Sequence, residues 1–433
     1  MNHRRYFIRD AGALLSSVFL SSCATLTSNK KDLSLNTRKN IGSVVIVGGG
    51  FSGASLARYL SILSRGRITI TLINKSKLFY SCPMSNLVLT GDKSAEYLSH
   101  EFSSLVQRGI SVLYDEVTYI DPIKKTIRTL TGKLIQADHL VVCPGIDLEF
   151  SAIDGFDAVA QRSVLHAWQG GTQTLALRRR LLTLSDGGVF LISIPPAPYR
   201  CPPGPYERAS LVANYFKRYK PKSKVLVLDA NPDVQSKKEL FVSTWTEKYV
   251  DNIEYISDFE VKGIDPKRGI LISQFGDKIK GDVLNVIPPN SSAKIAHQAD
   301  LVTDNDRWCD VNWRSMESVK YPGVYVLGDA TLSAEKMPKS AHMANQHSKI
   351  AALDIIAKLD GKEGLTDYKI VNTCYSFVDE IRAIFVSQVY SFELKTGTVK
   401  PIKGAGGLPS EPSVELGRQA YNWAEKIWLD SLG

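Results

Sequence analysis

The sequence predicts an α/β fold made of two Rossmann-like three-layer domains and a C-terminal α+β domain. The first observation is a β-branched run at 43–47 that leads into Gly48, Gly50 and Gly53 and then into a helical pattern at 54–63. A run of this kind is typical of a strand buried on both faces of a parallel sheet. Followed by a Gly-rich turn and a helix, it indicates a dinucleotide-binding unit.

The second observation is another α/β unit further along the chain. An apolar strand pattern at 189–194 is followed by a helical pattern at about 206–218 and a strand pattern at 224–228. Buried strand patterns at 138–142 and 324–327 complete the first domain. The third observation is a different sequence pattern from Phe377 onward. Strand patterns and a Gly-rich turn are followed there by a C-terminal helix from about Val414.

These patterns predict a division of the chain into five parts. They are a signal at 1–23, a linker at 24–40, a cofactor-binding domain in two pieces at 41–160 and 282–355, a second nucleotide-binding-like domain at 161–281, and a C-terminal domain at 356–433.

Composition excludes several classes of protein. With 22% charged and 44% hydrophobic residues in 433, the chain is neither disordered, collagen-like nor a coiled coil. Its longest apolar run, near 11–20, is too short to span a bilayer. The net charge of +9 contains no dense basic block, so we expect no nucleic-acid partner; the charge also fits an acidic protein surface.

The N-terminal residues predict an export leader. Arg4-Arg5 precede the apolar stretch at 11–20, and small residues then lead to Cys23. This order is typical of a twin-arginine signal that ends at a lipoprotein-type site. An amphipathic N-terminus, or a cysteine after an ordinary signal-peptidase site, is the alternative. The leader places the protein in the periplasm, where disulfides persist, and makes Cys23 a candidate lipid anchor.

The Gly-rich turn carries the first candidate site. Gly48 makes the tight turn, Gly50 lets a pyrophosphate approach the backbone, and Gly53 lets the helix pack close to the strand. Asn74 stands 21 residues after Gly53, where an acidic residue normally binds the ribose. An amide still forms hydrogen bonds with hydroxyls, so Asn74 predicts a weakened ribose contact.

Two later strand ends return to the same site. Gly145 ends the strand at 138–142, and Gly328-Asp329 end the strand at 324–327. Asp329 predicts a hydrogen bond to a ribityl hydroxyl, with a helix N-cap as the alternative. Two such motifs around an inserted α/β unit resemble the two-dinucleotide-binding-domain flavoproteins, which favours a flavin over a nicotinamide at the first site.

The second unit does not predict NAD binding. In place of a Gly-rich phosphate loop, the turn at 195–205 contains six prolines, which lack the N–H groups that a pyrophosphate needs. The turn presents Cys201 instead, which indicates a positioned redox thiol, with a buried structural thiol as the alternative.

Several motifs resemble the flavoprotein subunit of flavocytochrome c sulfide dehydrogenase across nearly the whole chain after residue 41. The matching segments are Tyr80–Asn86, Cys201–Ala209, Trp308-Cys309, Pro338–His342 with Asn345 beyond, and Cys374–Ser376.

The resemblance implies roles for four residues. Cys82 is similar to the residue that attaches FAD covalently through a thioether. Cys201 and Cys374 resemble the redox disulfide beside the flavin. Glu207 resembles an acidic residue near that disulfide, a candidate proton acceptor, with a solvated helix-face carboxylate as the alternative.

The resemblance also implies that Lys339 and Ser340 belong to the cofactor site, because the segment Pro338–His342 should open a helix whose positive end faces the flavin. Cys143 and Cys309 are expected to be buried small side chains, with a disulfide between them left open. No metal site is expected, and the sequence has no C-x-x-C-H motif for haem c.

The implied function is oxidation of sulfide to sulfur or polysulfide, with electrons passing from FAD to a c-type cytochrome subunit that carries the haem. One alternative is a sulfide:quinone oxidoreductase, disfavoured by a C-terminal helix that looks only mildly amphipathic. The other is a non-catalytic flavin electron-transfer subunit, disfavoured by the joint presence of Cys82, Cys201 and Cys374.

Overall fold

The computed structural model describes residues 39–303 and 306–433, so the predicted leader and Cys23 lie outside the described residues. The first domain is built on a seven-stranded sheet with the order β19-β20-β21-β9-β1-β2-β5. Its strands are β1 Gly42–Val47, β2 Ile68–Asn74, β5 Ser111–Tyr114, β9 His139–Val142, β19 Val311–Asn312, β20 Glu317–Ser318 and β21 Val324–Val326.

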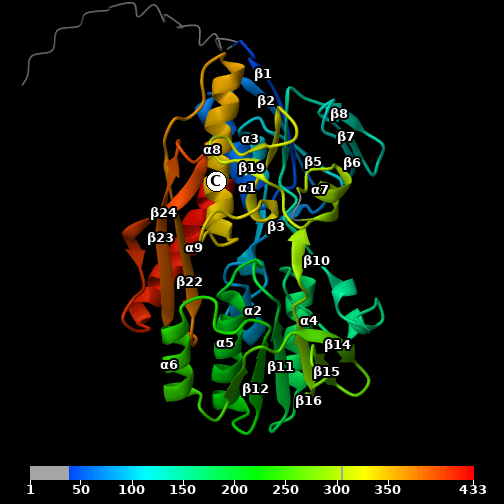
Figure 1. Cartoon of the computed structure of the whole chain (residues 1–433), viewed down its shortest axis with the longest axis vertical. Helices are drawn as coiled ribbons and strands as arrows, with labels where there is room; N and C mark the ends of the chain where they lie inside the picture. The colour runs from blue at the N-terminus through cyan, green and yellow to red at the C-terminus, as the bar shows by residue number, and fades with distance from the viewer. Residues whose placement is uncertain (1–38, 304–305) are drawn as a thin grey trace, which may run out of the picture. The chain divides into compact units, whose positions relative to one another are not determined.

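The centre of this sheet is parallel and buried. β1 lies between β2 and β9, and β21 joins the far side of β9, all in parallel pairing. Val44, Ile46 and Leu140 are at most 1% exposed, as expected where helices cover both faces of a parallel sheet. The helices α1 Phe51–Leu63 and α8 Ala341–Leu359 pack against each other beside it (Figure 1). The two helices therefore meet although they are far apart in sequence: the Asn345 amide donates to Ser55 Oγ at 3.0 Å across 290 positions.

The second domain contains a smaller parallel sheet with the order β13-β12-β11-β17. Its strands are β11 Val189–Ile194, β12 Lys224–Asp229, β13 Ile253–Ile256 and β17 Val283–Val286, and its helices are α4 Thr172–Thr183, α5 Gly204–Tyr219 and α6 Lys238–Lys248 (Figure 1). Because β17 pairs with β11, the predicted return to the first domain at residue 282 is early by one strand.

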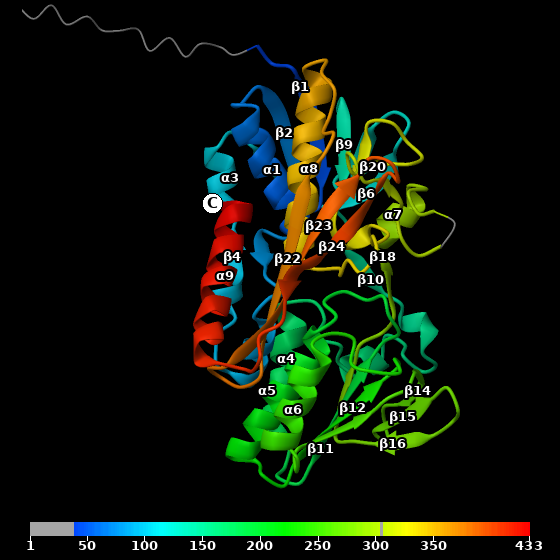
Figure 2. The same ribbon diagram turned by 60° about the vertical axis from the view of Figure 1, so that its left-hand side comes forward.

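The C-terminal segment forms an antiparallel sheet and a long helix. The strands are β22 Lys369–Phe377, β23 Ala383–Glu393 and β24 Thr398–Gly407, and the helix is α9 Val414–Leu432. Figure 2 shows α9 running beside α1 and against this sheet. The contact brings β22, which contains Cys374, to the boundary between the first two domains, since β22 also packs against α5 and α8.

Shorter elements complete the described chain. They are β3 Leu78–Tyr80, β4 Ser99–Glu101, β6 Val117–Asp121, β7 Thr126–Thr129, β8 Leu134–Gln136, β10 Ile146–Leu148, β14 Val261–Asp265, β15 Ile270–Ser273, β16 Lys278–Lys280, β18 Asn290–Ser292, α2 Ser85–Thr90, α3 Ser103–Gln107, α7 Lys294–Gln298, and the 3₁₀ turns η1 Glu96–Leu98, η2 Phe150–Ala152, η3 Ala160–Arg162 and η4 Gly328–Ala330.

The predicted fold class is confirmed: two parallel-sheet α/β domains and a C-terminal α+β segment. Among the helices of the described residues, none is both long and apolar enough to cross a membrane.

Candidate functional site

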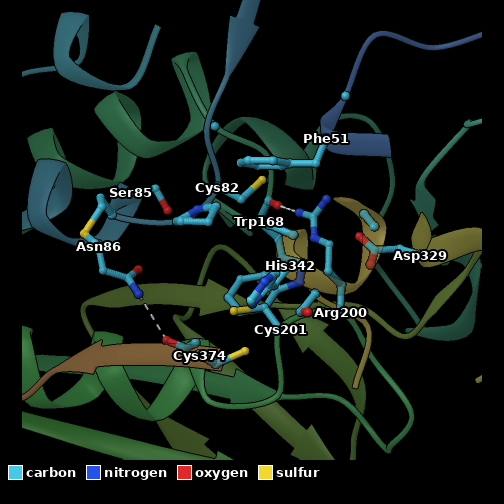
Figure 3. A pocket seen from close by; sticks show the side chains of 18 of the residues that line it. Phe51, Cys82, Ser85, Asn86, Trp168, Arg200, Cys201, Asp329, His342 and Cys374 are labelled. Atoms are coloured by element: carbon cyan, nitrogen blue, oxygen red, sulfur yellow. Dashed lines mark hydrogen bonds between the residues drawn. The ribbon is translucent and has the colours of Figure 1, made fainter. Parts of the chain in front are cut away.

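A cavity lies where the three parts of the fold meet. It is lined by the Gly-rich turn and α1 N-terminus of the first domain, the proline-rich turn of the second domain, and β22 and α9 of the C-terminal segment. Of the predicted site residues, the lining includes Gly50, Cys82, Gly145, Cys201, Glu207, Asp329, Ser340 and Cys374. Figure 3 shows the side chains of Cys82, Cys201 and Cys374 directed toward this space.

The Gly-rich turn has the geometry that a pyrophosphate needs. A Cβ on Gly53 would lie 1.8 Å from the Gly48 carbonyl oxygen, so α1 packs this closely only with glycine there. Gly48 has φ +99, and a Cβ there would lie 2.3 Å from the Cys143 carbonyl oxygen. Gly50, in contrast, faces open space on its cavity side, and α1 begins directly after it with no acidic residue in its first turn. The free N–H groups of α1 are therefore available to an anion.

Asp329 provides an unused acceptor at the other side of the same space. Within the described residues, its Oδ1 is buried without a hydrogen-bond partner, and burial raises the pKa of the carboxyl. Asp329 lies in the η4 turn after β21, while the N-cap of α8 is Ser340. The capping alternative for Asp329 is therefore wrong, and a buried, unpaired oxygen facing a cavity fits a ligand hydroxyl.

Lys339 supports Asp329 from behind the cavity. Its ammonium donates to the carbonyl oxygens of Asp329, at 3.1 Å, and Thr331, and lies 3.5 Å from the centroid of the Trp308 ring. Burial lowers the pKa of this lysine to about 7. Lys339 therefore holds the η4 backbone in place. It is absent from the residues that line the cavity, and its predicted place in the cofactor site stays a prediction.

Asn74 has a bracing role that the sequence analysis did not predict. Its Oδ1 accepts from the Gly49 N–H at 3.0 Å, and its Nδ2 donates to the Ser76 carbonyl at 2.8 Å. Both ends of the amide are used to brace the Gly-rich turn, because the short side chain folds back onto the neighbouring backbone. Asn74 is absent from the residues that line the cavity, and the expected ribose contact stays a prediction. Gly48, Gly53 and Gly328 likewise shape the turns without lining the cavity.

Cys201 is presented by a strained turn. The residue has φ 56, a left-handed conformation that non-glycine residues rarely adopt. Its N–H donates to the Lys339 carbonyl at 2.8 Å, which ties the proline-rich turn to the segment before α8. A Cβ on Gly204 would lie 3.0 Å from the Cys201 sulfur, so the following glycine leaves room for the thiol. The structure has Cys201 and Cys374 as free thiols, and the disulfide between them stays a prediction.

Cys374 sits in a polar setting at the N-terminus of α8. The Asn372 Nδ2 donates to its sulfur at 3.3 Å, and the Ser340 hydroxyl fixes Asn372 by donating to Oδ1 at 2.7 Å. The same Ser340 oxygen caps α8 by accepting from the Met343 N–H at 3.0 Å. Burial raises the pKa of the Cys374 thiol, and nearby Lys237 acts against this rise.

Glu207 lies in the first turn of α5 and faces the same cavity. One carboxylate oxygen accepts from the Phe377 N–H at 2.7 Å and the other from the Asn86 amide at 2.8 Å. Burial raises the pKa of Glu207, which favours proton uptake by this carboxylate. The alternative, a solvated helix-face carboxylate, is wrong.

Sequence reasoning missed several residues of the site. Trp168 lines the cavity with an indole N–H that is buried and unpartnered in the described part of the chain. Arg208 is 2% exposed and donates to Asn86 and to the carbonyl oxygens of His166 and Ala167. Its position next to Glu207 was an available signal. Trp168 had none, because it lies in a segment without a motif.

The second nucleotide-type unit is closed at the position where an acidic residue would bind a ribose. Asp229 ends β12, and its Oδ2 accepts from the hydroxyls of Tyr206, at 2.7 Å, and Tyr255, at 3.0 Å. The residue is fully buried. This carboxylate therefore anchors α5 through Tyr206, consistent with the predicted loss of NAD binding.

Cys143 and Cys309 are both buried, and both are free thiols. Burial raises the pKa of Cys143 to about 12 and that of Cys309 to about 11, so both are inert, as the prediction of small packed side chains requires.

Three protein-family models match the chain. The model described as pyridine nucleotide-disulphide oxidoreductase matches residues 42–180. The central part of the sulfide dehydrogenase [flavocytochrome c] flavoprotein chain matches 174–288, and flavocytochrome c sulphide dehydrogenase, flavin-binding, matches 367–432.

Comparisons with individual proteins agree. The flavoprotein chain of sulfide dehydrogenase [flavocytochrome c] from Chlorobaculum thiosulfatiphilum is 51% identical over 45 residues, which are 10% of this chain and 92% of that sequence. Mitochondrial sulfide:quinone oxidoreductase from Dictyostelium discoideum is 25% identical over 320 residues, 72% of this chain and 69% of the relative. The structure of sulfide:quinone oxidoreductase from Aquifex aeolicus superposes with a TM-score of 0.74 at 20% identity, covering 90% of this chain and 91% of that one.

Two dinucleotide-binding-type domains around a cavity lined by cysteines define a flavoprotein of the pyridine nucleotide-disulfide oxidoreductase class. Within this class, the chain belongs to the family of the flavocytochrome c sulfide dehydrogenase flavoprotein chain.

Proposed function

We propose that the chain is an FAD-dependent sulfide dehydrogenase flavoprotein that passes electrons to a c-type cytochrome. The observation that carries this proposal is the meeting of Cys201, Cys374 and Glu207 in one cavity, although Cys374 comes from a part of the chain far from the motif that contains the other two. A thiol pair beside a carboxylate with a raised pKa is suited to sulfur oxidation with proton uptake.

The residues around the cavity fit FAD. The N-terminus of α1 with Gly50 would hold the pyrophosphate, and Asp329 would accept a hydrogen bond from the ribityl chain. The N-terminus of α8, capped by Ser340, would place positive potential near the ring. When bound, FAD supplies a two-electron acceptor for the thiol pair.

The cysteines perform the sulfur chemistry. In the oxidised pair, hydrosulfide attacks one sulfur of the Cys201–Cys374 disulfide, so that one S–S bond forms, one breaks, and a cysteine persulfide and a cysteine thiolate result. A second hydrosulfide attacks the persulfide and releases its outer sulfur as a disulfane anion, leaving both cysteines reduced by two electrons in total. Glu207 accepts the proton that hydrogen sulfide loses on becoming the nucleophile.

We further propose that Cys82 forms a thioether to the flavin. Support comes from its place in the cavity, on the loop between β3 and α2, with the sulfur directed inward (Figure 3). Acid precipitation reports this bond directly, because a covalent flavin stays with the protein pellet, whereas the Cys82→Ser variant is expected to release its flavin into the supernatant.

The electron acceptor separates two functions. The similarity to proteins named sulfide:quinone oxidoreductase favours a quinone as the second candidate. The helix α9 argues against a quinone and so favours the cytochrome. Its apolar side is buried against α1 and the C-terminal sheet and is not available to a membrane surface. The Trp428 indole N–H also donates inward, to Ser81 Oγ at 2.8 Å. The helix is more clearly amphipathic than the sequence indicated, with its apolar stripe turned inward.

Anaerobic reoxidation tests the acceptor. Protein reduced with sodium sulfide is mixed with an oxidised c-type cytochrome or with a short-chain ubiquinone, and the return of flavin absorbance is followed by stopped flow. We expect the cytochrome to reoxidise the flavin within the mixing experiment and the quinone to act at least about 100-fold more slowly, a difference of about 2.7 kcal/mol in barrier. Faster reoxidation by the quinone would transfer the proposal to the quinone-linked activity.

A further inference from the structure

Lys237 is a buried lysine with an unusual position. It is 4% exposed, has φ 56, and is the N-cap residue of α6 in the second domain. Its ammonium crosses to the C-terminal sheet, where it donates to the Cys374 carbonyl at 3.0 Å and to the Ser376 hydroxyl at 2.8 Å. A buried ammonium loses much hydration energy, and these two neutral acceptors return only part of it. The placement therefore calls for a functional reason.

The charged groups near this lysine belong to the redox site. Cys374 on β22, Glu207 on α5 and Cys201 in the proline-rich turn all interact electrostatically with the ammonium. Phe241, on α6 itself, contributes its ring face at 5.8 Å from Nζ. The two sulfur atoms and the carboxylate therefore lie within electrostatic range of the positive charge.

Asn372 approaches the Cys374 sulfur from the other side. It is 2% exposed, and Ser340 holds its amide so that Nδ2 points at the sulfur, 3.3 Å away. The thiol also donates to Oδ1 of the same amide at 3.5 Å. This side chain therefore satisfies either protonation state of Cys374: it accepts from the thiol and donates to the anion.

We propose that Lys237 and Asn372 are positioning residues that stabilise negative charge on the Cys374 sulfur whenever its bond to Cys201 is open. The inference rests on the proposed function, which opens that bond in each turnover. A stabilised anion lowers the free energy of the reduced cysteine pair, which makes the disulfide a stronger oxidant of sulfide. Burial lowers the pKa of Lys237 to about 8, so the ammonium is mostly charged at pH 7, and its effect fades as the pH rises through 8.

The reactivity of Cys374 tests this proposal without the use of sulfide. Holoprotein is reduced with dithiothreitol, freed of it, and alkylated with iodoacetamide at pH 7, and the rate at Cys374 is read by peptide mass spectrometry. Loss of the charge in Lys237→Met is expected to raise the thiol pKa by about one unit and to slow alkylation about tenfold. Asn372→Ala is expected to slow it about threefold.

Two further variants separate charge from packing. Lys237→Arg keeps the charge and is expected to stay within about threefold of the unmodified protein. Lys238→Met removes the adjacent lysine, which is exposed and paired with Asp233, and is expected to change nothing. Alkylation of Cys374 at the unmodified rate in both Lys237→Met and Asn372→Ala, with native flavin spectra, would overturn the proposal. A Lys237→Arg protein as slow as Lys237→Met would also overturn it.

A different measurement, the bleaching of the flavin by sulfide, tests the proposed function itself. If sulfide does not bleach the flavin of the unmodified protein, sulfide oxidation is wrong, whatever the alkylation rates. If sulfide bleaches the flavin and Cys374 reacts equally in all variants, the function stands and the role of Lys237 and Asn372 is wrong.

Discussion

Glu207 shows how single residues set the chemistry of this cavity. Its two oxygens accept from the Phe377 N–H and the Asn86 amide, which favour the carboxylate form, while burial raises its pKa. The charge of Lys237 and of the neighbouring Arg208 opposes that rise. The balance leaves a carboxylate that is able to exchange protons near the sulfur atoms.

Glu207→Gln removes this proton acceptor. We expect the rate of flavin reduction by sulfide to fall about 100-fold at neutral pH, since general-base catalysis commonly contributes that much. In the unmodified protein the rate should fall as the pH drops through the raised pKa of Glu207, because the protonated acid accepts no proton. In the variant, the rate plotted against pH should lack this decrease and keep only the dependence that comes from the ionisation of hydrogen sulfide. Stopped-flow rates across pH check both, and an unchanged profile in the variant contradicts the role.

The turn between β1 and α1 shows how a local element prepares the cofactor site. Gly53 lies where a Cβ would collide with the Gly48 carbonyl, and Gly50 lies where a Cβ would enter open space. The two glycines are in the same short motif, yet one serves packing and the other serves a ligand.

Substitution by alanine separates these two roles. Gly53→Ala is expected to cost about 1–3 kcal/mol through overpacking, which lowers the thermal unfolding temperature and the flavin content together. Gly50 has φ −73, which alanine adopts without strain. Gly50→Ala is therefore expected to leave the unfolding temperature of the flavin-free protein unchanged and to lower the flavin content. Thermal scans and flavin-to-protein ratios measure both effects. Full flavin content in Gly50→Ala contradicts the assignment of the pyrophosphate to this turn.

The elements were largely predictable, because buried parallel strands and Gly-rich turns have strong local patterns. The strand patterns at 43–47, 189–194 and 224–228 correspond to β1, β11 and β12. The return to the first domain was placed early because β17 is a short buried strand, and the sequence does not say which sheet it joins.

Site residues were predictable where they belong to a sequence motif. They were not predictable where only the tertiary structure brings them to the cavity. Cys201 and Glu207 share one motif, but Lys237 reaches Cys374 across 137 positions of chain. The bracing hydrogen bonds of Asn74 and Lys339 were not predictable, because sequence position places a side chain near a site without giving its direction. Their hydrogen bonds to backbone groups decided that direction.

At the scale of the whole molecule, the cavity exists only where three parts of the chain are assembled. Cys82 comes from the first domain, Cys201 and Glu207 from the second, and Cys374 from the C-terminal sheet, which α9 holds against α1. Electron entry through the cysteine pair therefore depends on the tertiary arrangement, and neither domain alone contains the site. Both cysteines are therefore expected to be needed together for reduction by sulfide.

An anaerobic titration with sodium sulfide shows whether the Cys201–Cys374 pair passes electrons to the flavin. The flavin absorbance of the unmodified protein should bleach with about two electrons taken up per flavin. In Cys201→Ser and Cys374→Ser, bleaching should be at least about 1,000-fold slower, while a chemical reductant such as dithionite still bleaches the flavin fully. Bleaching of both variants by sulfide at the unmodified rate, or no bleaching of the unmodified protein, would contradict the account.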